Sequence, residues 1–435
     1  MYFHGTSRMN EDGQLEIGGI SAVELAKTYG TPLFVYDVAQ IRKRADEFQR
    51  AFDKEQVKGR VTYASKAFSS VAIIQLMDEL GLGLDIVSGG ELYTAQKANF
   101  PMEKIHFHGN NKSISEIEMA LEAGIGYFVV DNFFELQLLD RICQEKQQKA
   151  NILLRITPGI EAHTHDYIST GQEDSKFGFD LTSGQVDEAI EFSKKSEFVQ
   201  LDGIHCHIGS QIFTTVGFLM AIEKIFAAIS EWQENYQFVP SILNVGGGFG
   251  IRYVEGDEPL PADQYVEAIL QTVKKEAKTR ELPLPEVWIE PGRSLVGEAG
   301  TTLYTIGSEK TIPSIRKYVA VDGGMGDNIR PALYQAKYEA ALANRLQDKQ
   351  EEVVSIAGKC CESGDMLLWD VSLPKAKAGD LLAMFCTGAY GYSMASNYNR
   401  LPRPAVVFVE NGKSQLVVRR ETYEDIVRLD LPYEK

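Results

Sequence analysis

Eight short apolar runs, separated by stretches of helical periodicity, constrain the fold of this 435-residue chain more than any other feature. Each run is nearly continuously apolar, which is typical of strands buried on both faces of a parallel sheet. The intervening stretches repeat apolar residues at helical spacing, for example at 69–80, 91–99, 115–123 and 133–147. The eight runs are 60–64, 83–87, 104–108, 126–131, 151–157, 201–208, 242–246 and 286–290.

This alternation predicts a (β/α)8 TIM-like barrel, because eight parallel strands joined by helices are what such a barrel requires. An open doubly wound sheet is the alternative, but it usually contains fewer strands. After about residue 300 the runs are strand-like and are separated by turn signals such as Asn411-Gly412. We expect a barrel domain over 35–300 and a β-rich, barrel- or sandwich-like domain formed by 1–34 and 301–435. One helix is expected at 332–346, and the run 32–36 could belong to either domain.

Composition narrows the class of partner. The formal net charge of −17 argues against nucleic acid or an anionic membrane as the main partner. The N-terminal residues lack a signal-peptide pattern, and no apolar run approaches membrane-spanning length. The five cysteines are odd in number and show no metal-ligand spacing. We therefore expect a cytoplasmic protein without a metal site.

Polar residues gather where the predicted barrel strands end, and chemistry in such barrels collects at those ends. Five strand ends carry ionisable or glycine-rich elements: Lys66, Asp85, the segment 205–210, the three glycines at 246–248, and the segment 290–293. By itself, Lys66 is more often a solvated charge. In a partly dry pocket, a lysine amine can instead form a Schiff base with an aldehyde. The agreement of five strand ends favours this second interpretation.

The other strand ends suggest what the aldehyde belongs to. The glycines at 246–248 allow the backbone to approach an anion, with Gly292 as a companion, although a tight turn would also need glycine. Glu290 could pair with Arg293, or with the protonated nitrogen of a bound heterocycle. A lone histidine such as His207 is more often a core residue. Ser210 lies three residues further on, where it could reach a phosphate. Together these groups predict a pyridoxal 5′-phosphate site.

At these residues the chain resembles the fold-type III pyridoxal phosphate-dependent decarboxylases, and most closely the diaminopimelate decarboxylases among them. The resemblance covers nearly the whole chain. Its motifs lie at 63–67, 174–178, 207–211, 246–248, 290–293, 330–334, 361–365 and 388–390. It implies a cofactor-carrying barrel, a β-rich domain that completes the active site, and a homodimer whose active sites are shared between subunits.

The resemblance also implies roles for individual residues. Lys66 would hold the cofactor through a Schiff base, His207 would stack on its ring, and Glu290 would pair with the pyridine nitrogen. The remaining cofactor contacts would come from Ser210, Gly247, Gly248, Gly292, Arg293 and Tyr390.

Charge complementarity and the resemblance together indicate how the substrate would be bound. Diaminopimelate carries a carboxylate and an ammonium at its unreactive end, so its site needs an arginine fork as well as an acid. The carboxylate readers would be Arg293, Arg330 and Tyr334, with Glu362 for the ammonium and Tyr390 as a further substrate contact. Without the resemblance, Arg330 would be taken for a surface charge and Tyr334 for a helix-packing residue.

Cys361 would ordinarily be interpreted as a small buried hydrophobe. In the family, the matching cysteine protonates the carbanion and comes from the partner subunit, so the resemblance makes Cys361 catalytic together with Lys66 and His207. It gives no role to the neighbouring Cys360. Three histidine or lysine residues of the segment 161–177, His163, His165 and Lys176, could close over the site.

The predicted reaction is decarboxylation of meso-2,6-diaminopimelate to L-lysine and CO2. The alternatives within the enzyme class are decarboxylases of arginine, ornithine or carboxynorspermidine. From another class, the chain could be a non-catalytic pyridoxal phosphate-binding regulator, although such a protein would be expected to lack Lys66, Cys361 or the glycines. Racemases of this fold type rely on a tyrosine base that has no identifiable counterpart here.

Overall fold

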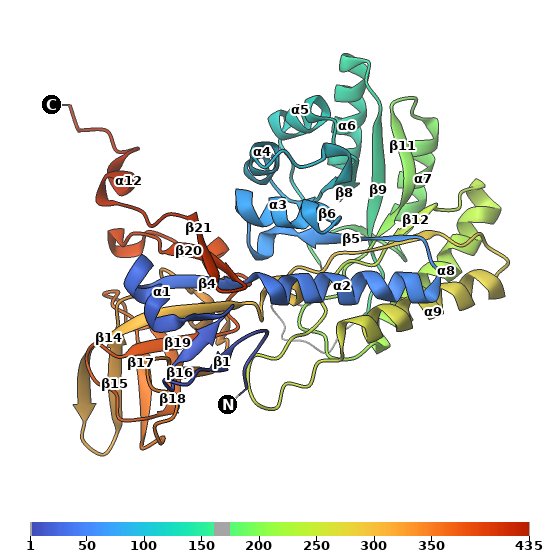
Figure 1. The fold of residues 1–435 in the computed structure, drawn as a ribbon. Helices are drawn as coiled ribbons and strands as arrows, with labels where there is room; N and C mark the ends of the chain where they lie inside the picture. The colour runs from blue at the N-terminus through green and yellow to red at the C-terminus, as the bar shows by residue number, and fades with distance from the viewer. Residues whose placement is uncertain (1, 161–174, 435) are drawn as a thin grey trace. The chain divides into compact units, whose positions relative to one another are not determined.

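The computed structural model describes residues 2–160 and 175–434. The chain forms two compact units. The barrel unit comprises Arg44–Ile251 and Glu258–Ser294, and the β-rich unit comprises Met1–Lys43, Arg252–Asp257 and Leu295–Lys435. Figure 1 shows both units along the colour gradient of the chain.

All eight predicted barrel strands are present, and they form a closed parallel barrel. The sheet order is β9-β11-β12-β13-β5-β6-β7-β8, and pairing of β8 with β9 closes it. A short strand, β10 (Phe179–Asp180), extends the sheet beside β9. The fold class predicted from the apolar runs is thus confirmed. The barrel strands are β5 (Gly59–Ala64), β6 (Gly83–Ile86), β7 (Ile105–Phe107), β8 (Tyr127–Val130), β9 (Ala150–Thr157), β11 (Val199–His205), β12 (Ile242–Asn244) and β13 (Glu286–Ile289).

Helices follow the strands and lie outside them (Figure 1). Their starts are encoded locally. Ser70, Ser88 and Asn132 each accept a backbone N–H from the first helical turn. Ser113 and Glu116 form a complete capping box. The helices are α3 (Val71–Glu79), α4 (Gly89–Lys97), α5 (Ile114–Ala123), α6 (Phe133–Lys146), α7 (Gln185–Lys195), α8 (Val216–Tyr236) and α9 (Ala262–Thr279), and α2 (Val38–Glu55) runs from the β-rich unit into the barrel unit.

The β-rich unit is built on a sheet of order β18-β17-β15-β14-β4-β20-β21, to which β16 and β19 are attached through β14. Strand β4 pairs antiparallel with β14 and parallel with β20. The predicted turn between β20 and β21 is present, with positive φ at both Asn411 and Gly412, as a type I′ turn requires. The strands are β4 (Leu33–Asp37), β14 (Gly300–Ile312), β15 (Arg316–Val321), β16 (Ala340–Leu342), β17 (Glu352–Ala357), β18 (Met366–Leu373), β19 (Leu381–Phe385), β20 (Ala405–Glu410) and β21 (Lys413–Val418).

The helix expected at 332–346 is wrong. The structure has only the short helix α11 (Arg330–Tyr334), which ends where Gln335 adopts a left-handed conformation. The alanine-rich segment that follows forms β16, which is buried and pairs with β19. Burial against a neighbouring strand therefore overrides the helix propensity of this segment.

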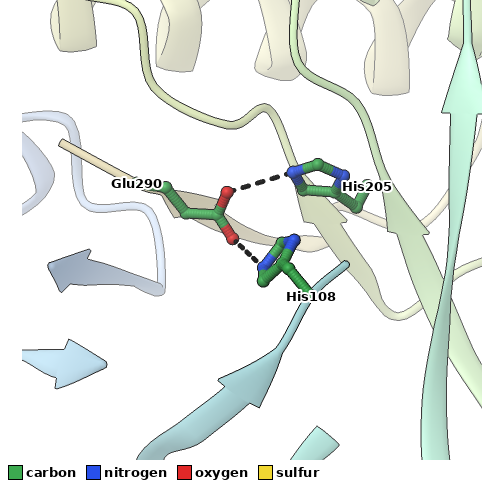
Figure 2. Close-up of side chains that lie close together, drawn as sticks. All are labelled: His108, His205 and Glu290. Carbon is green, nitrogen blue, oxygen red and sulfur yellow. Dashed lines mark hydrogen bonds and ion pairs between the residues drawn. The ribbon is translucent and has the colours of Figure 1, made fainter. Parts of the chain in front are cut away.

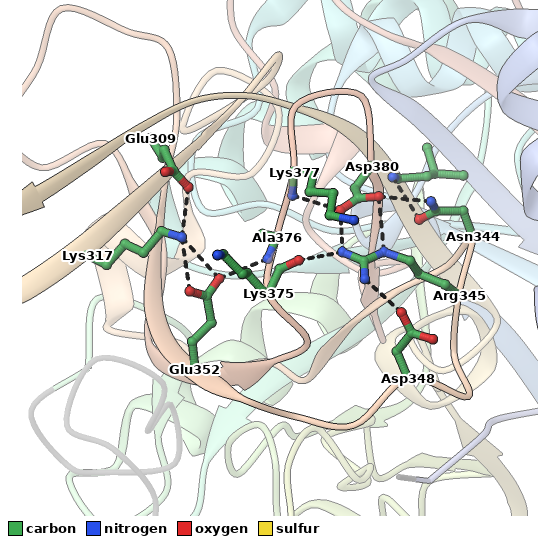
Figure 3. Close-up of polar contacts among 11 residues, drawn as sticks. Glu309, Lys317, Asn344, Arg345, Asp348, Glu352, Lys375, Ala376, Lys377 and Asp380 are labelled. Carbon is green, nitrogen blue, oxygen red and sulfur yellow. Dashed lines mark hydrogen bonds and ion pairs between the residues drawn. The ribbon is translucent and has the colours of Figure 1, made fainter.

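Two groups of ion pairs join segments of the β-rich unit (Figure 3). Arg345 forks onto Asp380, donating from Nε at 3.1 Å and from Nη2 at 2.6 Å. Its Nη1 donates to Asp348 at 2.7 Å. A second group centres on Lys317, whose Nζ lies 2.7 Å from Glu309 and 2.9 Å from Glu352.

Within residues 2–160 and 175–434, no helix is long and apolar enough to cross a membrane.

Candidate active site

The candidate lysine lies directly after the first barrel strand. Lys66 is the middle residue of the 3-10 turn η1 (Ser65–Ala67), and its side chain is exposed. The end of β5 is fixed to the loop after β13, because Ala64 N–H donates to Pro291 O at 3.3 Å. The charge of Lys66 contributes to the lowered pKa of His207, after the larger effect of burial. The lysine therefore belongs to the same mouth of the barrel as His207.

Polar side chains from three other strand ends surround Glu290, and Figure 2 shows two of them, His108 and His205. His205 Nε2 lies 3.0 Å from Oε2 of Glu290, and His108 Nε2 lies 2.9 Å from Oε1. Asn244 Nδ2 also donates to Oε1, at 2.6 Å. All four side chains are buried. Burial alone would raise the pKa of Glu290, but the contacts with His108 and His205 hold it well below its usual value. Glu290 is therefore an ionised carboxylate.

The composition of this cluster also resembles that of a small metal site, because the ligand atoms of His108, His205 and Glu290 lie within 4.8 Å of one another. The amide of Asn244, however, donates an N–H to the same oxygen that His108 approaches. An N–H aimed at that oxygen would repel a cation placed there. We therefore interpret the cluster as a carboxylate surrounded by polar side chains rather than as a metal site.

His207 is oriented by the glycine loop. The N–H of Gly247 donates to His207 Nδ1 at 3.2 Å, so that nitrogen carries no proton. Burial keeps the pKa of His207 well below its usual value, and its imidazole is neutral. A neutral, fixed imidazole is the form that can lie flat against an aromatic ring.

The glycine loop has no room for side chains. A Cβ on Gly247 would lie 2.1 Å from Glu290 O, and one on Gly248 would lie 2.2 Å from Gly209 O. Gly248 also has a φ of +102°. A Cβ on Gly292 would meet Ala64 Cβ at 3.0 Å. These positions bring bare backbone close to the barrel mouth, as binding of a phosphate requires.

Arg293 and Ser210 stand beside this loop as an anion-binding pair. Arg293 is buried, and its Nη2 donates to Ser210 Oγ at 2.9 Å. A guanidinium and a hydroxyl next to glycine backbone suit the charge and hydrogen-bonding needs of a phosphate or carboxylate.

In the β-rich unit, two adjacent cysteines have different environments. Cys360 is buried, and burial beside Asp365 raises the pKa of its thiol to about 11. Its N–H donates to Asp365 Oδ2 at 2.7 Å, and the other carboxylate oxygen accepts from Met325 N at 2.6 Å. Cys361 is exposed, and its N–H donates to Asn399 Oδ1 at 2.7 Å. Of this adjacent pair, only Cys361 presents its thiol to solvent.

The substrate-reading candidates of the β-rich unit also differ in exposure. Glu362 is exposed next to Cys361, whereas Tyr334 is half-buried at the end of α11. Arg330 is buried rather than a surface charge: its Nη1 donates to Tyr338 OH, and its guanidinium lies 5.1 Å from the ring centroid of Tyr253. The two tyrosines fix the guanidinium in place.

Tyr390 lies in the loop after β19, where the backbone is unusual. Its φ is +59°, and that of Cys386 in the same loop is +60°. The loop is anchored by Tyr36, whose OH donates to Gly388 O at 2.7 Å. Positive φ at two non-glycine residues of one loop is uncommon and clusters at functional sites.

His163, His165 and Asp174 lie outside the described residues. Lys176 is described and exposed, with its Nζ 4.9 Å from the ring centroid of Phe177.

The barrel residues fit pyridoxal 5′-phosphate on their own chemistry. An exposed lysine, a neutral fixed imidazole, an ionised carboxylate and a cradle that any Cβ would fill meet at one barrel mouth. These are the groups that an aldehyde, a flat ring, a protonated ring nitrogen and a phosphate need.

Comparison with known proteins identifies the family. Residues 38–297 match the family described as pyridoxal-dependent decarboxylase, pyridoxal binding domain. Diaminopimelate decarboxylase of Bacillus subtilis (strain 168) is 67% identical over 433 residues, covering 100% of this chain and 99% of that protein. The chain belongs to the diaminopimelate decarboxylase family. The resemblance seen in the motifs is therefore confirmed, and the chain is a pyridoxal-dependent carboxy-lyase.

Other members of the family agree with this assignment. Diaminopimelate decarboxylase of Halalkalibacterium halodurans is 66% identical over 435 residues, covering 100% of this chain and 99% of the relative. The crystal structure of diaminopimelate decarboxylase from M. jannaschii in complex with L-lysine has a TM-score of 0.93 and 39% identity, and covers 100% of this chain and 99% of that one. The similarity thus extends over both units.

Sequence reasoning missed the partners of Glu290. It considered Arg293 and a ring nitrogen, whereas the structure shows His108, His205 and Asn244. A usable signal was present, because each of the three lies at or just after the end of a barrel strand, the position from which the other candidates were chosen.

Proposed function

We propose that this chain decarboxylates meso-2,6-diaminopimelate to L-lysine and CO2, with pyridoxal 5′-phosphate as its cofactor. The observation that carries the proposal is the 67% identity to a diaminopimelate decarboxylase along the whole chain. The similar M. jannaschii enzyme was crystallised with L-lysine, which is the product that this reaction releases.

The barrel unit would hold the cofactor. When bound, pyridoxal phosphate supplies an aldehyde for the substrate amine and a protonated ring that accepts electrons as the carboxylate leaves. Lys66 would hold the aldehyde carbon covalently, and the neutral His207 would support one face of the ring. The ionised Glu290 would hold the proton at the ring nitrogen. The phosphate would be bound by Ser210, Gly247, Gly248, Gly292, Arg293 and Tyr390.

The substrate would be recognised by two arginine side chains and by one exposed glutamate. Arg293 and Arg330 would bind the distal carboxylate of diaminopimelate, with Tyr334 and Tyr390 as neutral partners. Arg330 suits this role because its guanidinium is already fixed by Tyr338. Glu362, which is exposed, would bind the distal ammonium. An ornithine site would need the acid but not the arginines.

Cys361 would donate the proton that the α-carbon needs after CO2 leaves. Its exposure supports this role, because a donor must reach the substrate and then be reprotonated from solvent. Cys360 does not suit the role, because it is buried and burial raises its pKa to about 11. We assign Cys360 to packing of the 358–365 loop around Asp365.

The assembly that we propose is a homodimer with active sites shared between subunits. The barrel unit and the β-rich unit would each be a structural domain. The β-rich unit of one subunit would complete the active site of its partner through Cys361 and Glu362. Mixing Lys66→Ala and Cys361→Ala chains tests this arrangement. Hybrid dimers should recover part of the activity, whereas hybrids that form without recovery would show that each site is made within one chain. The five free thiols are consistent with a cytoplasmic enzyme.

The substrate is tested by measuring CO2 release from diaminopimelate, arginine, ornithine and carboxynorspermidine side by side with the pyridoxal phosphate-loaded protein. We expect release from meso-diaminopimelate alone, with L-lysine as product. Faster release from any of the other three would assign the chain to that substrate instead. If the protein binds the cofactor but releases CO2 from none of the four substrates, the chain would be assigned as a non-catalytic regulatory protein.

A further inference from the structure

The donors around Glu290 come from three separate strands. His108 follows β7, His205 ends β11 and Asn244 ends β12. The carboxylate therefore has polar partners at both oxygens: His205 at Oε2 and Asn244 at Oε1 by hydrogen bonds, and His108 Nε2 at 2.9 Å from Oε1 without hydrogen-bond geometry. A carboxylate surrounded in this way is fixed in orientation by groups that belong to the rigid barrel rather than to loops.

The two imidazoles that face Glu290 are neutral. Burial lowers the pKa of His108 to about 4 and lowers that of His205. A neutral imidazole carries one N–H, and each ring turns its Nε2 toward Glu290. His205 Nδ1 is buried and has no hydrogen-bond partner among residues 2–160 and 175–434. Burying Nδ1 as an unpaired acceptor costs less free energy than burying it as an unpaired N–H. The proton of His205 therefore lies on Nε2.

A second buried carboxyl, that of Asp85, lies near His108. Asp85 Oδ1 lies 3.7 Å from His108 Nε2. Burial raises the pKa of Asp85 well above its usual value, and the nearby charge of Glu290 raises it further. The two carboxyls thus differ in the direction of their shift: the pKa of Glu290 is lowered and that of Asp85 is raised. The other groups that influence Glu290 or are influenced by it are His106, Arg155, Cys206 and His207.

We propose that His108 and His205 are positioning residues that keep Glu290 ionised and oriented, and that they thereby set the strength with which the barrel binds a ring protonated at nitrogen. Without these contacts, burial would raise the pKa of the carboxyl, as it does for Asp85. A protonated Glu290 could no longer hold the ring proton. This inference rests on the proposed function, because it takes pyridoxal phosphate as the ligand and Glu290 as the partner of its ring nitrogen.

The first test measures the titration of Glu290 in the apoprotein, by 13C NMR with glutamate labelled at Cδ. Glu290→Gln identifies the resonance. His108→Leu and His205→Leu each remove a polar contact with Glu290, whereas His108→Gln and His205→Gln keep a polar side chain of similar reach. We expect each Leu variant to raise the titration midpoint by about one pH unit or more, and each Gln variant to stay close to wild type.

The second test measures binding of pyridoxal 5′-phosphate by equilibrium dialysis at pH 6 and pH 8.5. For the double variant His108→Leu/His205→Leu, we expect about tenfold or greater weakening at pH 6 and much less at pH 8.5, where Glu290 is ionised again. The double Gln variant should bind within about twofold of wild type at both values. A purely structural defect would instead weaken binding equally at the two pH values.

The outcomes separate this inference from the proposed function. An unchanged Glu290 midpoint in both Leu variants, or equal weakening at both pH values, overturns the positioning role. Failure of the wild-type protein to bind pyridoxal phosphate contradicts the proposed function, while the apoprotein titration still decides the ionisation of Glu290. If one Leu variant does not fold, the other, compared with its own Gln partner, decides the question.

Discussion

The barrel unit and the β-rich unit present their candidate residues in different ways. In the barrel, partners from neighbouring strands hold Glu290 and His207, whereas Lys66 is exposed. In the β-rich unit, Cys361 and Glu362 are exposed, and Arg330 is held by Tyr338. Burial lowers the pKa of His207, and contacts with two histidines lower that of Glu290 against the effect of burial. The exposed pair depends on whatever covers it, which is consistent with a site completed by another subunit.

The largest effect should come from the exposed barrel residue. Lys66→Ala should lower CO2 release by about 10³-fold or more, because no other group can hold the aldehyde carbon. Lys58 is a matched control: it precedes the same strand, and its exposed side chain pairs with Glu286. Lys58→Ala should keep nearly full activity, and borohydride should fix the cofactor to the control but not to Lys66→Ala. A Lys66→Ala protein of wild-type rate would contradict the assignment.

The adjacent thiols provide the next comparison. Cys361→Ala should lower turnover by about 10²-fold, the usual contribution of a positioned proton donor. Cys360→Ala should change turnover little, because its thiol is buried and burial raises its pKa to about 11. Steady-state assays of the two variants decide the matter. A larger loss at Cys360 would reverse the roles of the pair.

Two buried groups, His108 in the barrel unit and Asp327 in the β-rich unit, should respond to pH in opposite directions. His108 has a folded pKa of about 4 against an ordinary 6.5, so its contribution is present above pH 6.5 and is lost as pH falls toward 4. That loss amounts to about 3 kcal/mol of barrel stability. In the β-rich unit, Asp327 has a folded pKa raised to about 7 by burial, so its contribution is present below pH 4 and is lost as pH rises through 7. That loss amounts to about 4 kcal/mol.

Hydrogen exchange followed by mass spectrometry at pH 5 and pH 8, corrected for intrinsic rates, measures this difference. Lowering the pH should weaken protection in β7 and β11 and strengthen it around residues 323–328. His108→Gln and Asp327→Asn should each reduce the pH dependence of their own unit. If both units weaken together toward acid, the assignment of these protonation states is wrong.

The smallest effects should separate the two ion-pair groups of the β-rich unit. Arg345→Lys keeps the charge but loses the fork onto Asp380, and should cost about 1–2 kcal/mol of unfolding free energy. Glu309→Gln should lower the unfolding free energy less than Arg345→Lys does, because the Glu309 side chain is 57% exposed. Urea midpoints of both variants test the ranking. Equal losses would show that exposure does not control the strength of these pairs.

The sequence allowed the barrel to be predicted strand by strand, because parallel barrel strands are short and apolar on both faces. The β-rich unit was predicted less completely. The segment 332–346 was expected to be a helix, but Ala340, Ala341 and Leu342 are buried against β19, a contact that local periodicity does not contain. Strand β18 was not expected either, and four of its eight residues, including Trp369, are not buried.

Among the site residues, those at strand ends could be chosen from the sequence, but their partners could not. The contacts that keep Glu290 ionised come from residues 108, 205 and 244, and their convergence depends on closure of the barrel. Burial of Arg330 likewise depends on Tyr253, which is distant in sequence. The sequence therefore predicts which residues meet at a barrel mouth more readily than their charge states.

The pairing of β4 with β14 and β20 has a consequence for the order of folding during synthesis. Strand β4 is separated in sequence from the other strands of this sheet by the barrel strands, and the last strand of the sheet ends at Val418. The ribosome therefore synthesises every barrel strand before the neighbours of β4. The barrel can begin to form while the apolar strand β4 still lacks its partner strands β14 and β20. Chains stalled before β20 should present β4 to chaperones, and this exposed strand would be the point at which incomplete chains associate.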